Sequence, residues 1–273
     1  MSNGVMGGVR AVASVVGVLA SMTLAAEELT GADLVQRCDL DTFAGHDNRS
    51  VLTVLLRDAS GNEKKNVYKR YWKDLDGKGG IDDKMILFTE FPPDASGTGF
   101  MRWGYVAGAD NNAEQWLYLP SLKSIRRVSV RDPGDSFLGS ELTYQDISPR
   151  LLTQDTHTLL RTEQRNGAEY YVVESLPKET RPLYGKVVAW YAKVSQWADC
   201  RKARVEFYEP NGSLLKTQVL KWQQVGKAWL WDEVVVNNAK TGHSSVFRVT
   251  SPEIDVGLSD ALFSERTLQR GIR

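Results

Sequence analysis

The sequence predicts a mainly β (α+β) protein built on one antiparallel sheet that curls into a barrel or half-open barrel. Three observations predict it. Short runs rich in β-branched and aromatic residues follow one another along most of the chain, turns rich in Gly, Asn and Pro separate them, and one clear helix precedes them. The chain is 42% hydrophobic and 25% charged, which is typical of a globular protein.

The N-terminal 26 residues have the pattern of a secretory signal peptide. Arg10 precedes an apolar run over residues 11–25, and the polar part begins with Glu27 and Glu28. This run is short for a membrane-spanning helix. We therefore expect cleavage near residues 25–26, which leaves residues 27–273 as a single exported domain that does not span a membrane. An uncleaved N-terminal anchor is the alternative.

The predicted helix opens the mature chain. Thr30 and Asp33 have the spacing of a capping box, and Leu34, Val35 and Cys38 recur at helical spacing on one side. We expect the helix to end near residues 41–45, and a second short helical piece near residues 259–263.

Roughly a dozen runs are expected to be short strands. They span residues 50–57, 63–72, 83–91, 98–106, 114–120, 123–130, 157–165, 168–176, 186–194, 201–209, 213–225, 228–238 and 244–251. Turn residues stand between neighbouring runs, such as Asn166-Gly167 and residues 210–212, and they favour hairpins because they accept a positive φ or a tight bend.

Several of these strands are apolar on both faces. A half-exposed strand should alternate apolar and polar residues. In residues 114–120, however, Trp116 and Tyr118 face one way while Leu117 and Leu119 face the other. Both faces of the sheet therefore need a cover. The helix can cover one, and an apolar ligand could cover the other; short helical segments not evident in the sequence are the alternative.

The polar, glycine-containing loop at residues 132–147 offers a weak match to a catalytic motif. Residues 134–138 approach the G-x-S-x-G pattern of a nucleophile elbow around Ser136, but Leu138 replaces the last glycine that the sharp turn requires. The three histidines lie far away in the sequence: His46, His157 and His243. We expect no catalytic residue here.

Metal, cofactor and nucleic-acid sites are not indicated either. Residues 74–85 resemble a calcium loop, but Lys78 and Met85 stand where oxygen ligands are needed, so we expect a hairpin turn. Basic and acidic side chains balance at 34 each, which gives no field for nucleic acid. The basic stretch from Lys123 to Arg131 could meet phosphate groups or protect an exposed strand edge.

Only two cysteines are present, Cys38 and Cys200. In an oxidising compartment they could form a disulfide. Two separate, buried thiols are the alternative, and the sequence leaves both open.

Three segments together resemble a known family. They are residues 91–103, 114–129 and 135–147, with the sequences FPPDASGTGFMRW, EQWLYLPSLKSIRRVS and DSFLGSELTYQDI. In this order they resemble the periplasmic outer-membrane lipoprotein-sorting proteins, larger relatives of the lipoprotein carrier LolA. The resemblance implies a LolA/LolB-like sheet of about eleven strands, half closed around an apolar cavity with short helices as a lid. It also implies a periplasmic location and an RND-type inner-membrane transporter as partner.

We expect large apolar side chains to line that cavity. The candidates are Phe100, Trp103, Trp116, Tyr118, Phe137, Leu138, Trp190 and Trp222. In the loop, Phe137 and Leu138 are expected to fold over the cavity rim as a flap, while Asp135, Ser136 and Ser140 bond to loop backbone. The alternative is a loop packed against the core for stability alone.

The leading functional hypothesis is a carrier that binds lipid or lipoprotein acyl chains in this cavity and passes them between membranes. The second is a periplasmic sensor of the same fold that binds lipid or misfolded outer-membrane protein. The third is an export-linked enzyme that uses the cavity as a substrate tunnel. A carrier requires a broad apolar lining and no catalytic group, which agrees with the weak matches of this sequence to catalytic motifs.

Overall fold

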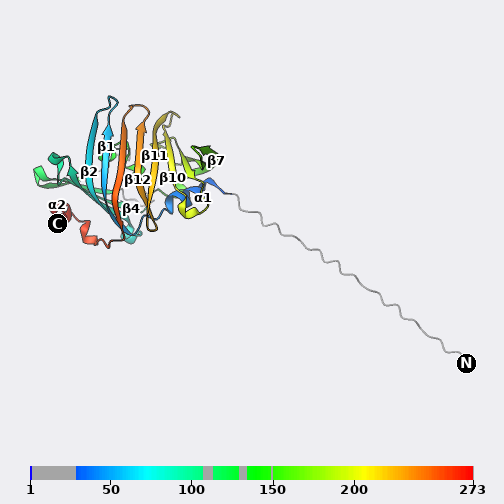
Figure 1. Cartoon of the computed structure of the whole chain (residues 1–273), viewed down its shortest axis with the longest axis horizontal. Helices are drawn as coiled ribbons and strands as arrows, with labels where there is room; N and C mark the ends of the chain where they lie inside the picture. Colours follow the sequence, from blue (N-terminus) through cyan, green and yellow to red (C-terminus); the bar gives the residue numbers. More distant parts are fainter. Residues whose placement is uncertain (2–28, 107–112, 129–133, 149, 273) are drawn as a thin grey trace.

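The computed structural model describes residues 1, 29–106, 113–128, 134–148 and 150–272, and these form thirteen strands in one antiparallel sheet (Figure 1). Apart from Met1, the predicted signal peptide lies outside the described residues. The strands are β1 Asp47–Arg57, β2 Glu63–Asp74, β3 Ile81–Phe91, β4 Gly99–Tyr105, β5 Glu114–Leu119, β6 Ser124–Val128, β7 Asp155–Arg165, β8 Ala168–Pro177, β9 Lys186–Ala192, β10 Lys202–Tyr208, β11 Leu214–Val225, β12 Ala228–Asn238 and β13 Ser244–Ile254.

The sheet consists of two meanders joined in the middle. Its strand order is β6-β5-β4-β3-β2-β1-β13-β12-β11-β10-β9-β8-β7, so the first and last strands of the chain pair with each other. Strands β6 and β7 form the two edges and the sheet does not close. This confirms the predicted curled antiparallel sheet and half-open architecture, with thirteen strands instead of the eleven implied by the resemblance.

The register separates the two faces of the sheet. Leu87 pairs with Phe100, and the adjacent Ile86 pairs with Met101, so the two pairs point to opposite sides. We call the face of Leu87 and Phe100 the inner face, because the N-terminal helix and the segment between β6 and β7 pack on it. The face of Ile86 and Met101 is the outer face.

The main hydrophobic core lies on the inner face. Fully buried side chains from strands in both halves of the sheet meet there, including Val54, Leu87, Val173 and Phe247. The N-terminal helix adds Leu34, which has no exposed surface. The core thus joins the two meanders, which supports a single domain.

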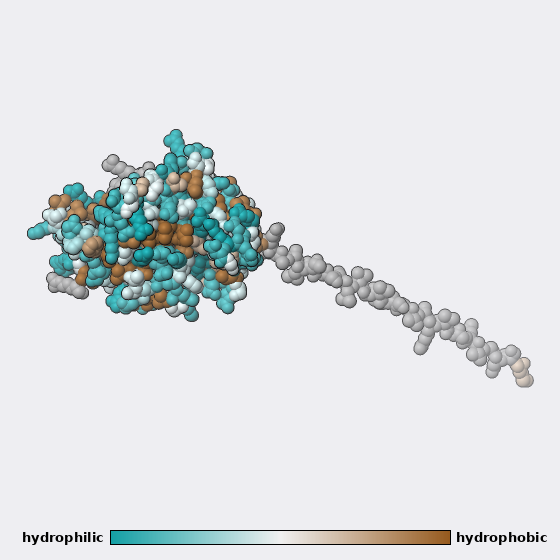
Figure 2. Space-filling view, turned by 45° about the horizontal axis from the view of Figure 1, so that its top comes forward, coloured by the Kyte–Doolittle hydropathy of each residue, from teal (hydrophilic) through white to brown (hydrophobic). Residues whose placement is uncertain are grey.

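Two smaller clusters lie on the outer face. On β3–β5, Ile86, Met101 and Trp116 are covered by Phe263 and Leu268 from the C-terminal segment. On β8–β10, a second cluster contains Val172, Val188 and Trp190. Figure 2 shows that apolar side chains on the visible side of the molecule gather in a band between hydrophilic surroundings.

The helices are few and short, as predicted. Helix α1, Gly31–Val35, begins with the expected capping box at Thr30 and continues as one π-helical turn over Gln36–Leu40. Helix α2, Glu265–Arg270, follows a 3-10 turn at Asp260–Leu262. Gly31 lets α1 approach β7 closely, because a Cβ there would lie 2.8 Å from backbone atoms of residues 157–159.

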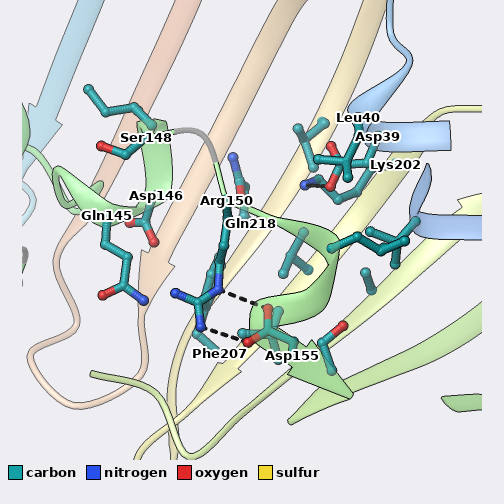
Figure 3. Close-up of a pocket in the computed structure, with 18 of the residues that line it drawn as sticks. Asp39, Leu40, Gln145, Asp146, Ser148, Arg150, Asp155, Lys202, Phe207 and Gln218 are labelled. Atoms are coloured by element: carbon teal, nitrogen blue, oxygen red, sulfur yellow. Dashed lines mark hydrogen bonds and ion pairs between the residues drawn. The ribbon is translucent and has the colours of Figure 1, made fainter. Parts of the chain in front are cut away.

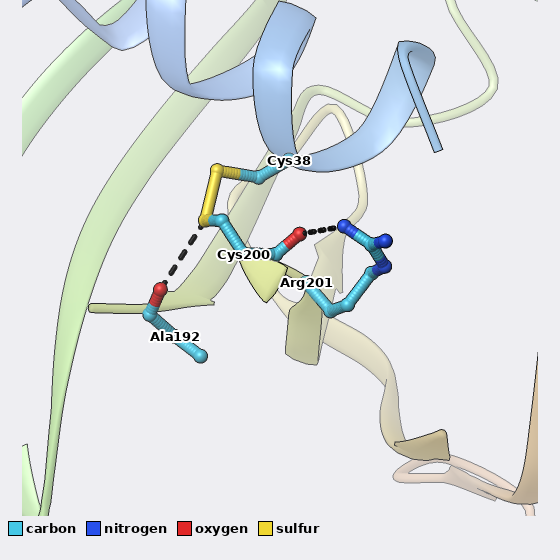
Figure 4. The surroundings of a disulfide bond; sticks show 4 residues. All are labelled: Cys38, Ala192, Cys200 and Arg201. Carbon is cyan, nitrogen blue, oxygen red and sulfur yellow. Dashed lines mark hydrogen bonds between the residues drawn. A yellow bond between two sulfur atoms is a disulfide. The ribbon is translucent and has the colours of Figure 1, made fainter. Parts of the chain in front are cut away.

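A disulfide between Cys38 and Cys200 settles the alternative left open by the sequence (Figure 4). Cys38 lies in the π turn after α1, and Cys200 immediately precedes β10. The bond joins positions 162 residues apart in sequence. It therefore ties the N-terminal helix to the inner face of the second meander.

Candidate functional site

The inner face contains a cavity of about 570 Å³. This volume lies within the range of sites for small ligands. Its floor is formed mainly by β9–β12, and its other walls come from the turn after α1, from the start of β3, and from the segment that precedes β7. The cavity thus lies where the second meander curls beneath the connection between the two meanders.

The floor of the cavity is apolar. Every second residue of β9 faces it, namely Val187, Ala189 and Tyr191. The remaining large side chains come from β10–β12, and they are Val205, Phe207, Leu220, Trp222 and Trp231. This alternation follows from the period of two in a strand, which sends the intervening residues to the outer face.

The roof is the connection between β6 and β7, described over residues 134–148 and 150–154, which we call the roof segment. It contains three 3-10 turns, and its Phe137 and Leu142 are buried in the inner core. Phe137 packs edge-on against Phe100 of β4 and against Tyr144, with ring centroids 6.0 and 5.8 Å apart. The apolar side chains of this loop therefore dock it against the sheet.

A buried ion pair holds the roof segment over the floor. Lys216 of β11 donates from Nζ to Asp146 Oδ2 at 2.5 Å and to the carbonyl oxygen of Glu141 at 2.9 Å. The two charged side chains are only 3% and 2% exposed. Tyr184 donates to the other oxygen of Asp146 at 2.8 Å. Burial, and after it the charge of Asp146, raises the pKa of Tyr184, so the phenol stays a neutral donor.

Two further ion pairs stand among the lining residues (Figure 3). Arg150 of the roof segment binds Asp155 with Nε and Nη2, at 2.8 and 2.6 Å. Lys202 of β10 binds Asp39 in the turn after α1 at 2.6 Å. The Arg150–Asp155 pair holds the roof segment to the start of β7, and the Lys202–Asp39 pair holds the turn after α1 to β10. Both pairs fix elements that border the cavity.

Apolar side chains mark where the cavity meets solvent. Leu40 and Leu151 both line it, and they are 42% and 41% exposed. Solvent-exposed leucines at an opening provide an apolar path from the surface to the floor. This arrangement can admit a hydrocarbon chain.

The structure places the eight predicted lining residues in three groups. Trp222 lines the cavity, while Phe100, Phe137 and Leu138 pack in the inner core without lining it. The other four lie on the outer face, in the clusters described above, and they are Trp103, Trp116, Tyr118 and Trp190. Their assignment to the cavity is corrected, because each is one residue out of phase with the strand positions that point inward.

The prediction for the loop at residues 132–147 is confirmed in part over its described residues. Ser136 donates to the carbonyl oxygen of Ser140 at 2.6 Å, and Ser140 donates to that of Phe137 at 2.7 Å, as expected. Phe137 is 5% exposed and belongs to the core instead of forming a rim flap. The residues of the roof segment that border the cavity lie later in the chain, at positions 145–148 and 150–152.

The sequence missed the floor residues of β9 and β10. Their alternation was visible in KVVAWYA and KARVEFY. It could not show which phase points inward, because Val187 and Val188 are equally apolar. The pairing of Cys38 with Cys200 would have supplied this information, since it fixes the helix to the inner face beside β10.

Groups with catalytic potential are engaged in structural contacts. His157 lines the cavity, where Nδ1 shares a 2.8 Å hydrogen bond with Ser175 and Nε2 shares one of 3.0 Å with the carbonyl oxygen of Leu152. In the part of the chain that the structure describes, no group of three or more His, Cys, Asp or Glu could hold a metal ion. None of the helices formed by described residues has the length and apolar character needed to cross a membrane.

Residues 81–270, which are more than half of the chain, match a family model described only as that of an uncharacterized protein. A search of curated proteins found no match. A solved domain named for outer membrane lipoprotein sorting, from Vibrio parahaemolyticus, is 28% identical with a TM-score of 0.75, over 88% of this chain and 98% of that one.

Two other solved structures are similar. A DUF1329 family protein from Desulfovibrio piger is 25% identical with a TM-score of 0.75, over 87% of this chain and 97% of that one. A LolA superfamily protein from Nitrosomonas europaea shares the fold, with a TM-score of 0.63 at 20% identity, over 88% of this chain and 99% of that one. The chain therefore belongs to the DUF1329 family, and its structural neighbours are LolA-superfamily lipoprotein-sorting domains.

Proposed function

We propose that the protein is a periplasmic carrier that binds an acyl chain of a lipid or lipoprotein in the cavity and passes it between membranes. The observation that carries this proposal is the hollow of about 570 Å³ with an apolar floor in a sheet that is otherwise packed on its inner face. The similarity to a domain named for outer membrane lipoprotein sorting supports the same function.

The energetics of a hydrocarbon chain in water explain why such a cavity is useful. Exposing each methylene costs about 0.8 kcal/mol, so a chain of twelve carbons costs about 10 kcal/mol. Contact with the side chains of β9–β12 removes most of this cost. The fixed polar groups at the roof and the opening limit tight packing around the ligand, which suits a carrier that must release its load.

The predicted handover to an RND-type inner-membrane transporter stays a prediction of the family resemblance. The transfer assay described next separates the sensor hypothesis from the carrier hypothesis, because a sensor would bind lipid without transferring it. We propose no catalytic step in the cavity, because His157, Asp39 and Asp155 are held by the contacts described above.

A transfer assay between two vesicle populations tests the proposal. Val187→Trp should fill the cavity from its floor and abolish transfer of a fluorescent acyl lipid. Val219→Trp is the matched control, because Val219 is 37% exposed and lies on the outer face of β11. Wild type and Val219→Trp should transfer lipid equally. Equal transfer by a folded Val187→Trp variant, or none by wild type, would contradict the proposed function.

A further inference from the structure

The side chain of Arg102 on β4 is buried and only partly paired. It donates from Nη1 to both oxygens of Asp83, at 2.9 and 3.1 Å. Among the described residues, its Nε and Nη2 atoms have no hydrogen-bond partner, although the residue is only 3% exposed. A buried donor without a partner is costly, so such a group in a folded protein calls for an explanation.

Other arginines of this chain show what these two donor atoms bind. Arg49 uses Nε and Nη2 to hold both carboxylate oxygens of Glu253, at 2.9 and 2.6 Å. Arg150 binds Asp155 with the same two atoms. The Nε and Nη2 donors form a planar fork whose spacing matches two oxygens of one carboxylate or phosphate. In Arg102 the same two donors pair with no other described residue.

Gln115 completes the donor set next to this fork. It pairs with Arg102 across β4 and β5, so both side chains point to the inner face. Gln115 has no exposed surface, and both polar atoms of its amide lack a partner among the described residues. An oxyanion bound by the Arg102 fork could also accept from the amide nitrogen of Gln115.

Arg102 and Gln115 adjoin the cavity at Asp83. Asp83, which binds Arg102, lines the cavity together with Trp72, and Trp72 Nε1 donates to Asp83 at 3.0 Å. Gly104 makes room for the guanidinium, because a Cβ there would lie 2.1 Å from Asp83 Oδ1 and 2.9 Å from Arg102 Nη1. Asp83 therefore links the Arg102 side chain to the cavity wall.

The charges around the fork include both signs. Arg70 of β2 lies nearby on the inner face, donates to Asn48, and has no ion pair with a described residue. Asp83 and Asp82 are the facing carboxylates, and Tyr144 and Asp135 of the roof segment also interact with this region. Burial, and after it the charges of Asp83 and Asp74, raises the pKa of Asp82.

We propose that Arg102 and Gln115 form a binding site for the oxyanion head group, a carboxylate or a phosphate, of the amphiphile whose acyl chain occupies the cavity. This inference rests on the proposed carrier function and names the polar part of its ligand. The site selects ligands by charge, whereas the apolar floor accepts any chain of suitable length.

Three ligands with the same twelve-carbon chain test the site by calorimetry on the delipidated protein. Laurate and dodecyl phosphate should each bind about tenfold more tightly than 1-dodecanol, because charged hydrogen bonds outweigh neutral ones. Binding by laurate alone identifies a carboxylate ligand, and binding by dodecyl phosphate alone identifies a phosphate ligand.

Two variants assign any selectivity to the proposed site. Arg102→Lys keeps a cation beside Asp83 but removes the fork, so it should abolish the preference for either anion over dodecanol. Gln115→Leu removes two unpartnered buried atoms, so it should fold and should bind laurate several-fold more weakly. Equal affinities for anion and alcohol in wild type, or undiminished selectivity in folded variants, would overturn the inference. Failure of all three ligands to bind would instead refute the carrier function itself.

Discussion

The two faces of the sheet are covered in different ways. On the outer face of β3–β5, the chain returns at its C-terminus and seals the surface with Phe263 and Leu268, which are 1% and 0% exposed. Gly99 allows this close contact, because a Cβ there would lie 2.7 Å from a methyl group of Leu268. On the inner face, the roof segment spans β9–β12 and leaves about 570 Å³ open.

This difference shows that the C-terminal segment covers β3–β5 of the outer face with packed side chains, whereas the cover of the inner face leaves space over β9–β12. A packed cover contributes stability through close contacts. A cover that leaves space gives up part of that stability, and polar contacts such as Lys216–Asp146 hold it in place. We interpret the outer cluster as structural and the inner cavity as functional.

Truncating one buried side chain on each face should give the largest difference in the free energy of unfolding. Phe263→Ala should lower the free energy of unfolding by about 3–5 kcal/mol, because it opens a cavity in a packed cluster. Leu220→Ala should cost about 2 kcal/mol, at the low end for leucine, because Leu220 already borders open space. Denaturant titration measures both, and an equal or larger loss for Leu220→Ala would contradict the contrast.

Removing the buried cation under the roof segment should lower the free energy of unfolding nearly as much as Phe263→Ala. Lys216→Met leaves the buried carboxylate of Asp146 without its ion-pair partner, so we expect a loss of about 3–5 kcal/mol. Lys221→Met on the same strand is the control, since Lys221 is 65% exposed in its pair with Glu233 and should contribute about 0–1 kcal/mol. Similar stabilities for the two variants would mean that Lys216 does not hold the roof.

The disulfide should contribute somewhat less to the free energy of unfolding than Lys216 does. Cys38→Ala combined with Cys200→Ala removes a link across 162 residues, and we expect a loss of about 2–4 kcal/mol in thermal or chemical unfolding. The same change should loosen α1 from the inner face, which faster amide exchange in residues 31–40 would reveal. An unchanged unfolding midpoint would show that packing alone holds the helix.

The smallest effects concern two carboxylates with opposite pH dependence. Burial raises the pKa of Asp82 above 3.8, so its contribution to stability falls as pH rises from 3.8 through the folded pKa. The hydrogen bond from Lys73 lowers the pKa of Asp260 below 3.8, so its contribution is present above 3.8 and is lost as pH falls through the folded pKa.

Asp82→Asn should remove the first trend, and Asp260→Asn should remove the second. Unfolding free energies of both variants, measured between pH 3 and 6 against wild type, test the signs. If both substitutions changed the pH dependence of the unfolding free energy in the same direction, the contrast between Asp82 on the cavity wall and Asp260 on the outer face would be contradicted.

The sequence was sufficient to predict the strands, because their alternating and apolar runs and their turn residues are local signals. It also indicated that both faces need a cover, from the pairs Trp116–Tyr118 and Leu117–Leu119. It could not tell which phase of β4, β5 and β9 points inward. That choice depends on where the C-terminal segment and the roof segment return to the sheet, and these contacts are remote in sequence.

The cavity residues were predicted poorly for the same reason. Trp103, Trp116 and Tyr118 have the size expected of a ligand-binding lining, but the C-terminal segment buries them on the outer face. The smaller Val187 and Ala189 line the cavity instead. The buried donors of Arg102 that pair with no other described residue were not evident in the sequence, because such a group is recognised only when its neighbours are known.

Native mass spectrometry of the protein purified from the cells that express it tests the central claim most directly. We expect wild type and Val219→Trp to carry one or more molecules with the mass of an acyl lipid or lipoprotein, and Val187→Trp to carry none. A wild-type protein that stays free of ligand after incubation with acyl lipids, or a Val187→Trp variant that retains the same ligand, would contradict the account.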